Sequence, residues 1–245
     1  MRAYRGRIFC LERHTDRLFG SLRALGQEPN FFKKEIEGWV ESSLKESKFS
    51  EAMVRLSVHG EPSGKSRWVV IVREFKPYPK EWFEKGIELR TATRLKSSVK
   101  AQDSKIKCSE YAGSILAHLD AAARPGGEFV FLNQNLTVSE CAVSNIFIVR
   151  AKTLLTPAPA SGILEGVTRS AVIELAGKED IEVRETFLTR HEVYTAEECF
   201  ITNTSFEILP VSGMDGRKIN GGTPGPVTRK LMAGFKLLCT QSKER

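Results

Sequence analysis

The feature that most constrains the fold is a strand-rich stretch over residues 128–156, in which the segment of residues 137–149 contains a lone glutamate. Within it, TVSECAVSNIFIV ends in the apolar run Phe147 to Val149, which is typical of a strand that enters a core. Glu140 stands between two such runs. An isolated glutamate most often lies in solvent, whereas a buried one needs a partner. The rest of the chain decides between these two interpretations.

The stretch FKPYPKE, over residues 75–81, is rich in proline and predicts an extended linker. It divides the chain into a small α+β N-terminal domain over residues 1–75, a linker over 76–81 and a larger domain over 82–245. The order of strands and helices on both sides predicts an α/β protein of two domains.

Periodicity places the elements of the first domain. Leu18, Leu22 and Leu25 share one face of a predicted helix, and Gly26 is a stop signal after it. A second helix and a pair of strands follow; the helix carries Ile36, Val40 and Leu44, and the strands MVRLSVHG and RWVVIVREF are joined by the turn GEPSG.

The larger domain is predicted to begin with a helix around YAGSILAHLDAAA and to continue with the strands of residues 128–156. A helix that opens near Gly166 and a strand at ECFITN come next. A final helix completes the chain, with an apolar face made of Val227, Leu231, Phe235 and Leu238.

Composition excludes several classes of protein. The 245 residues include 41% hydrophobic and 27% charged residues, which is ordinary for a globular chain, and no apolar run is long enough to span a bilayer. The start MRAYRGRIFCLERH is too broken by arginines for a signal-peptide core, so we expect a cytoplasmic location. The five cysteines are scattered without a CxxC pair, so we expect reduced thiols. The net charge of +7 comes from dispersed basic residues, which favours small anionic molecules over nucleic acid.

SGILEGVTRSAVIELA, over residues 161–176, has the outline of an anion site. Gly162 and Gly166 allow tight turns, Thr168 can cap a helix, and the N-terminus of a helix offers unpaired N–H groups to a phosphate. A plain capped helix explains this segment equally well. TNTS, over residues 202–205, follows a strand and indicates either a ligand-binding loop or an ordinary turn.

The order of these segments carries a resemblance. A lysine, ECAVSNIFIV, TP, GILEGVTR and ITNTSFEILPV follow one another as in the class IV aminotransferases of pyridoxal-phosphate fold type IV. That family includes branched-chain aminotransferases, D-amino acid aminotransferases and aminodeoxychorismate lyases. The resemblance runs from about Arg2 to near the C-terminus. It implies the D-amino acid aminotransferase-like fold, the cofactor pyridoxal 5'-phosphate, amino acid and 2-oxo acid substrates, and a homodimer.

The resemblance also implies roles for two catalytic residues. Glu140 pairs with the pyridine nitrogen of the cofactor and keeps it protonated. The lysine that bonds covalently to the cofactor is sought among Lys100, Lys105 and Lys107, and alignment outward from the helix YAGSILAHL selects Lys107. Lys107 then moves the proton between the substrate and the cofactor, while Lys105 is predicted to be a solvated surface residue.

For the phosphate group, the resemblance assigns Arg17 of HTDRL, Val167 with Thr168, and Thr204. An arginine suits a phosphate because its planar fork donates two parallel hydrogen bonds. Leu164 is expected to pack on the face of the pyridine ring.

Some positions depart from the family pattern. Relatives have a G-D-G-x-x-E-like segment before the part that matches MRAYRGRIF, so we expect an incomplete small domain and a gain in activity when that segment is restored. His59 and Phe206 stand where relatives often have an arginine and a small residue. The segment with GPVT before the last helix favours a transaminase, and the alternatives are aminodeoxychorismate lyase or a cofactor-binding protein with little turnover.

Overall fold

The computed structural model describes residues 1–60, 66–98, 100–109, 112–113, 115–116 and 128–241. The helix expected around YAGSILAHLDAAA lies largely outside these residues. The chain divides into two compact units. The first comprises Met1–Pro77, Ile106–Cys108 and Lys236–Arg245; the second comprises Tyr78–Lys105 and Ser109–Phe235. The division into domains at 75 and 82 remains a prediction from sequence.

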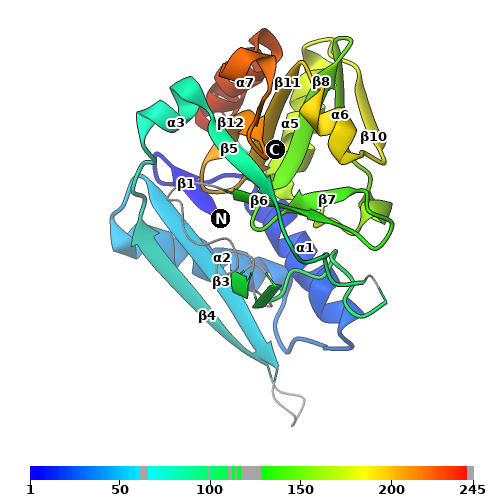
Figure 1. Ribbon diagram of the computed structural model, residues 1–245. Helices are drawn as coiled ribbons and strands as arrows, with labels where there is room; N and C mark the ends of the chain where they lie inside the picture. The colour runs from blue at the N-terminus through cyan, green and yellow to red at the C-terminus, as the bar shows by residue number, and fades with distance from the viewer. Residues whose placement is uncertain (61–65, 99, 110–111, 114, 117–127, 242–245) are drawn as a thin grey trace. The chain divides into compact units, whose positions relative to one another are not determined.

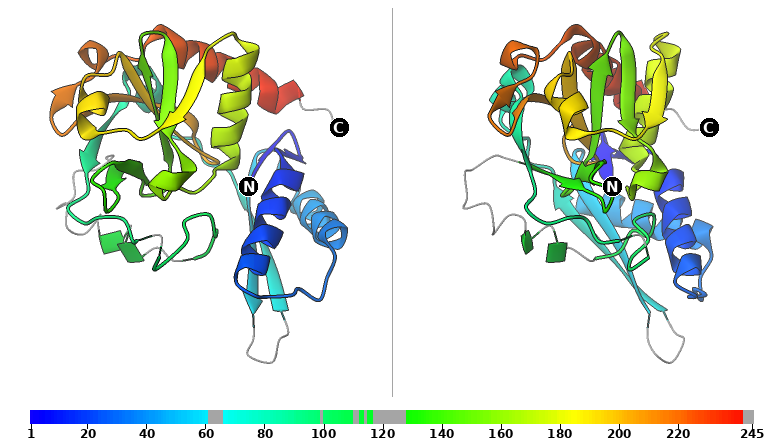
Figure 2. Two further views of the ribbon diagram at one scale, coloured as in Figure 1. Left: turned by 90° about the vertical axis from the view of Figure 1, so that its right-hand side faces the viewer. Right: turned by 45° about the vertical axis from the view of Figure 1, so that its right-hand side comes forward.

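The first unit is a four-stranded antiparallel sheet with two helices. The strands lie in the order β2-β1-β3-β4, with the bounds Arg2–Tyr4 for β1, Arg7–Ile8 for β2, Ala52–Gly60 for β3 and Ser66–Glu74 for β4. Figure 1 shows β3 and β4 as one long hairpin. Helices α1 (Leu11–Ala24) and α2 (Lys33–Ser47) lie side by side against this sheet (Figure 2).

Apolar spacing explains why α2 packs on the sheet. Ile36, Val40 and Leu44 recur every four residues and are buried, and they join Val54 in the core of the first unit. Burial of each such side chain contributes roughly 1.5–3 kcal/mol. The two helices and the two strands predicted here from periodicity are confirmed.

The second unit contains a nine-stranded mixed sheet in the order β10-β9-β8-β11-β12-β5-β6-β7, with β13 paired to β12. Its strands are Ile87–Thr91 (β5), Glu128–Leu132 (β6), Val138–Cys141 (β7), Asn145–Arg150 (β8), Thr153–Pro157 (β9), Val183–Thr186 (β10), Glu198–Asn203 (β11), Glu207–Met214 (β12) and Arg217–Lys218 (β13). The strands predicted over residues 128–156 and at ECFITN are confirmed.

This sheet curls until its ends meet. The N–H of Val138, on the terminal strand β7, donates to the carbonyl of Leu188, just beyond the opposite terminal strand β10 (2.7 Å). Figure 2 shows the curl. Because the interior is enclosed from most sides, strands such as β6 and β7 are buried along their whole length. The curled sheet therefore provides places where a polar side chain is removed from bulk water.

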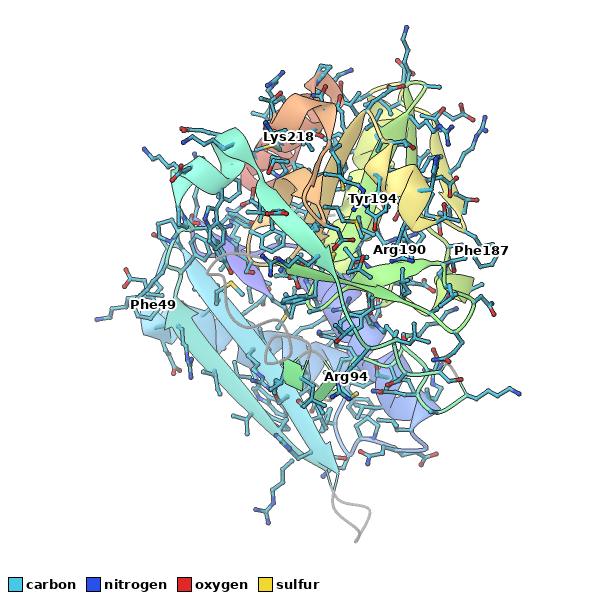
Figure 3. All side chains as sticks on the ribbon, viewed as in Figure 1. Phe49, Arg94, Phe187, Arg190, Tyr194 and Lys218 are labelled. Atoms are coloured by element: carbon cyan, nitrogen blue, oxygen red, sulfur yellow. The ribbon has the colours of Figure 1, made fainter. Side chains whose placement is uncertain are left out.

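Helices close the second unit. They are Lys80–Lys85 (α3), Val167–Lys178 (α5), Arg190–Tyr194 (α6) and Pro226–Gln241 (α7), with short 3-10 turns at Pro159–Ser161 (η1) and Asn220–Gly222 (η2). The hydroxyl of Tyr194 on α6, labelled in Figure 3, donates to Asp215 (2.7 Å) and ties α6 to the end of β12. No helix in the described residues is both long and apolar enough to cross a membrane.

Candidate active site

Glu140 lies on the buried strand β7, not at a solvent-exposed edge. One carboxylate oxygen, Oε2, accepts hydrogen bonds from the backbone N–H of Leu164 (2.9 Å) and from Asn145 Nδ2 (3.3 Å). The other oxygen, Oε1, accepts one from the ammonium group of Lys96. A buried carboxylate is stable when it is paired and hydrogen-bonded, and both conditions hold here.

The segment between η1 and α5 is tied to the strands that carry Glu140. Ser139 Oγ donates to the carbonyl of Gly162 (2.9 Å), and Asn145 Nδ2 donates to the carbonyl of Leu164 (2.8 Å). A Cβ atom on Gly166 would lie 2.3 Å from Asn145 Oδ1, so glycine is the residue that permits this close approach. The motifs ECAVSN and GILEGVT, separated in sequence, therefore form one connected structure.

Helix α5 begins directly after this segment. Its N-cap is Gly166, and no side chain caps it, so the prediction that Thr168 caps the helix is wrong. Thr168 is instead the second residue of the first turn and is buried together with Val167. Because a glycine can adopt the capping conformation by itself, Thr168 has no capping role. The N–H groups of this first turn have no partner within the helix, which is the condition for binding an anion.

Thr204 follows β11 in the turn that leads to β12. On β11, Thr202 is paired in register with Asn145 of β8, so this turn starts beside the residue that contacts Glu140. Asn203 Oδ1 stabilises the turn by accepting from the N–H of Ser205 (2.9 Å). Phe206 is buried in the core of the second unit.

Arg17 and Lys107 belong to the first unit and lie near each other. Ser21 Oγ accepts a hydrogen bond from the N–H of Lys107 (3.0 Å) and donates to the carbonyl of Arg17 one turn earlier in α1 (2.9 Å). Burial lowers the pKa of Arg17. Burial, with additional repulsion from the Met1 amino group, Arg17 and Lys107, lowers the pKa of His14. This environment is electropositive and suits an anion.

All three candidate lysines are exposed, and their neighbours differ. Lys105 is largely exposed and forms a surface ion pair with Glu165 (3.1 Å), in agreement with its predicted role. Lys100 is exposed in a turn after Ser98. In terms of position, Lys107 is therefore the candidate that lies close to the predicted phosphate ligand Arg17.

Sequence reasoning predicted no contact of Glu140 within the chain, and it left two of the contacting residues, Lys96 and Asn145, without any role. Asn145 was visible in the motif ECAVSNIFIV, and its role follows once the strands pair. Lys96 had no local signal, because it lies 44 residues before Glu140 in an irregular segment.

Glu128 on β6 is a second buried carboxyl group, which accepts from the N–H of Phe129 (3.1 Å) and from Ser144 Oγ (3.3 Å). Burial raises the pKa of Glu128 to about 6.

Comparison with known proteins decides which chemistry this arrangement serves. The sequence profile of the amino-transferase class IV family matches residues 1–214. This chain belongs to the class IV aminotransferases. A putative branched-chain-amino-acid aminotransferase of Methanocaldococcus jannaschii is 36% identical over 98% of this chain and 86% of its own length. A D-alanine aminotransferase of Listeria monocytogenes is 30% identical over 96% of this chain and 83% of its own length.

The fold agrees with that of solved class IV enzymes. A branched-chain amino acid aminotransferase from Thermobaculum terrenum, solved in its PLP-form, superposes with a TM-score of 0.87 at 27% identity, covering 98% of this chain and 84% of that one. The predicted fold is thereby confirmed, and the protein is a pyridoxal-phosphate-dependent aminotransferase of class IV. In the second unit, a buried carboxylate suits a protonated ring nitrogen and a helix N-terminus suits a phosphate. In the first unit, Arg17 suits a phosphate and Lys107 offers a primary amine for the aldehyde.

Proposed function

We propose that this class IV aminotransferase transfers the amino group of a branched-chain amino acid to a 2-oxo acid, as a cytoplasmic homodimer. The observation that carries the proposal is the buried Glu140, joined through Leu164 to the segment that opens α5. Support for the branched-chain substrate comes from the names of the relatives. The D-alanine aminotransferase among them makes a D-amino acid the second candidate substrate.

We assign the cofactor-binding roles as follows. Glu140 faces the ring nitrogen and Leu164 packs on the ring, while the phosphate is bound by Arg17, Val167, Thr168 and Thr204. When bound, the cofactor supplies an electron-accepting ring that stabilises negative charge on the substrate α-carbon. The carboxylate of Glu140 supports this by holding a proton at the ring nitrogen. The N-terminus of α5 adds roughly half a positive charge toward the phosphate.

Lys107 carries out the proton transfer in this proposal. Its Nζ removes a proton from the substrate α-carbon and would deliver it to the cofactor, which requires an amine that is neutral for part of the cycle.

Chemical labelling tests the assignment of Lys107. Borohydride reduction of the purified protein followed by peptide mapping is expected to place the cofactor on Lys107, and the variant Lys107→Ala is expected to lose covalent labelling and about 10⁴-fold of its turnover. Lys105→Ala is the matched control and should keep both. A label on Lys105 or Lys100 would overturn the assignment.

Substrate assays separate the remaining alternatives. Half-reactions with branched-chain amino acids, D-alanine and glutamate are expected to show branched-chain amino acids as the fastest. Faster reaction with D-alanine would assign the second candidate substrate, and pyruvate release from aminodeoxychorismate without transamination would assign the lyase. Cofactor binding with none of these reactions would indicate a protein with little turnover.

The homodimer is supported by apolar side chains exposed on β4, Val69 (44%) and Ile71 (39%), which a partner surface can cover. Sedimentation equilibrium measures the state directly. A monomer at micromolar concentration would contradict it.

A further inference from the structure

Lys96 lies in the segment after β5, two residues beyond Arg94, which is labelled in Figure 3. Both the backbone N–H and the backbone carbonyl of Lys96 form hydrogen bonds. The N–H of Lys96 donates to the carbonyl of Leu132 at the end of β6 (2.8 Å), and its carbonyl accepts from Gln134 Nε2 (2.9 Å). In the sheet, β6 lies between β5 and β7. The chain therefore holds Lys96 at the edge of β6, and the side chain reaches Glu140 on the neighbouring strand β7.

From this geometry we propose that Lys96 is a positioning residue for Glu140: it holds the carboxylate ionised and in a fixed orientation for the ring nitrogen of the cofactor. The inference deepens the proposed function and rests on it. Lys96 does not replace Lys107 as the covalent attachment point in this proposal.

The orientation follows from the direction of the contacts. The donors of Leu164 and Asn145 reach Oε2, whereas Lys96 reaches Oε1, so the carboxylate is held at both of its oxygens. Rotation of the carboxylate plane would break bonds on both sides at once. A carboxylate offers about four acceptor positions, so Lys96 does not by itself prevent a further donor from reaching Glu140.

The ionisation follows from burial. The side chain of Glu140 is 11% exposed and that of Lys96 is 21% exposed, so water screens their interaction poorly. A buried carboxylate with neutral donors alone takes up a proton more readily than one with a cation beside it. Of these three donors, Leu164 and Asn145 supply neutral hydrogen bonds, and the ammonium group of Lys96 supplies a full opposite charge.

The chain contains a natural control for this ion pair. Lys105 and Glu165 form a second lysine–glutamate pair in the same unit, with side chains that are 58% and 46% exposed. Exposed pairs of this kind contribute about 0–1 kcal/mol. Substitution of Lys105 therefore removes a lysine charge from the same unit without changing the contacts of Glu140.

The experiment compares Lys96→Met, Lys96→Gln, Lys96→Arg and Lys105→Met with the unsubstituted protein. The dissociation constant of pyridoxal phosphate is measured across the pH range by equilibrium dialysis, and kcat/KM is measured over the same range. The two neutral variants are expected to move the acid limb of both profiles upward by about one pH unit, because Glu140 becomes protonated more easily. Lys96→Arg and Lys105→Met are expected to leave the midpoints in place.

Each other outcome has a defined meaning. Profiles of Lys96→Met and Lys96→Gln that superpose on that of Lys105→Met would overturn the role of Lys96 while leaving the proposed function intact. Failure of both neutral variants to fold, judged by circular dichroism, would also overturn it in favour of a purely structural ion pair. If the unsubstituted protein binds no pyridoxal phosphate, the proposed assignment of the site fails instead.

Discussion

Two buried carboxylates of the second unit, Glu140 on β7 and Glu198 on β11, are held in different ways. Glu198 accepts from the N–H of Val227 (3.0 Å), the N–H of Thr228 (2.7 Å) and the hydroxyl of Thr228 (2.7 Å), all in the first turn of α7. Gly225 leaves room for it, since a Cβ there would lie 2.0 Å from Glu198 Cδ. Glu140 instead accepts from Lys96, Asn145 and Leu164, which come from three separate segments.

The difference separates a carboxylate that stabilises a helix start from one to which we assign a role in cofactor binding. The donors of Glu198 are neutral groups at one helix N-terminus, where the helix dipole stabilises an anion. The GPVT segment, which favoured a transaminase in the sequence analysis, forms the start of α7, and its N–H groups donate hydrogen bonds to Glu198. The contacts of Glu140 hold it firmly but include a long, partly exposed lysine side chain, and the carboxylate lies beside the segment that opens α5.

The substitution Glu140→Gln should produce the largest effect in this comparison. An amide can still accept a hydrogen bond from Leu164, but it has no charge with which to hold a proton at the ring nitrogen, so turnover should fall by about 10³-fold. The protein should retain cofactor, bound with a higher dissociation constant than in the unsubstituted protein. Steady-state kinetics on protein of measured cofactor content checks this, and near-normal turnover would mean that Glu140 is not the partner of the ring.

The substitution Glu198→Ala should lower stability and leave turnover nearly unchanged. It leaves two N–H groups and one hydroxyl at the start of α7 without their acceptor, so the free energy of unfolding should fall by about 3 kcal/mol. Turnover per molecule of bound cofactor should stay close to normal. Urea denaturation and kinetics on the same preparation provide the measurement. A large loss of turnover without loss of stability would erase the distinction between the two carboxylates.

Glu128, a third buried carboxyl group, should have the smallest effect, a change of stability with pH. Its pKa of about 6 in the folded protein exceeds the ordinary value of 4.5, so the unfolded chain loses the proton first as the pH rises. Stability therefore declines between about pH 4.5 and pH 6, and the deficit of about 2 kcal/mol persists above that range. Glu128→Gln should recover up to this amount near pH 8 and nothing near pH 4 in urea denaturation. If Glu128→Gln and the unsubstituted protein give the same urea denaturation curve at each of the two pH values, the raised pKa is refuted.

Much of the fold was predictable because local patterns coincide with the tertiary packing. The apolar faces of α1, α2 and α7 and the alternation along β3 follow from residue spacing alone. Short strands such as β1, β2 and β10 carried too few residues for a periodic signal. Their pairing is decided by the longer strands beside them, because two to four residues have little conformational preference of their own.

The sequence by itself determined the family, the order of the motifs and the choice of Glu140 as a residue that needs a partner, because these depend on residue identity and spacing. Only the tertiary structure decided which residues contact Glu140. Lys96 reaches Glu140 only because β6 holds its backbone next to β7, and Thr168 loses its predicted capping role because Gly166 adopts the N-cap position. Contacts across 44 residues depend on strand order in a curled sheet, and no local pattern of residues encodes that order.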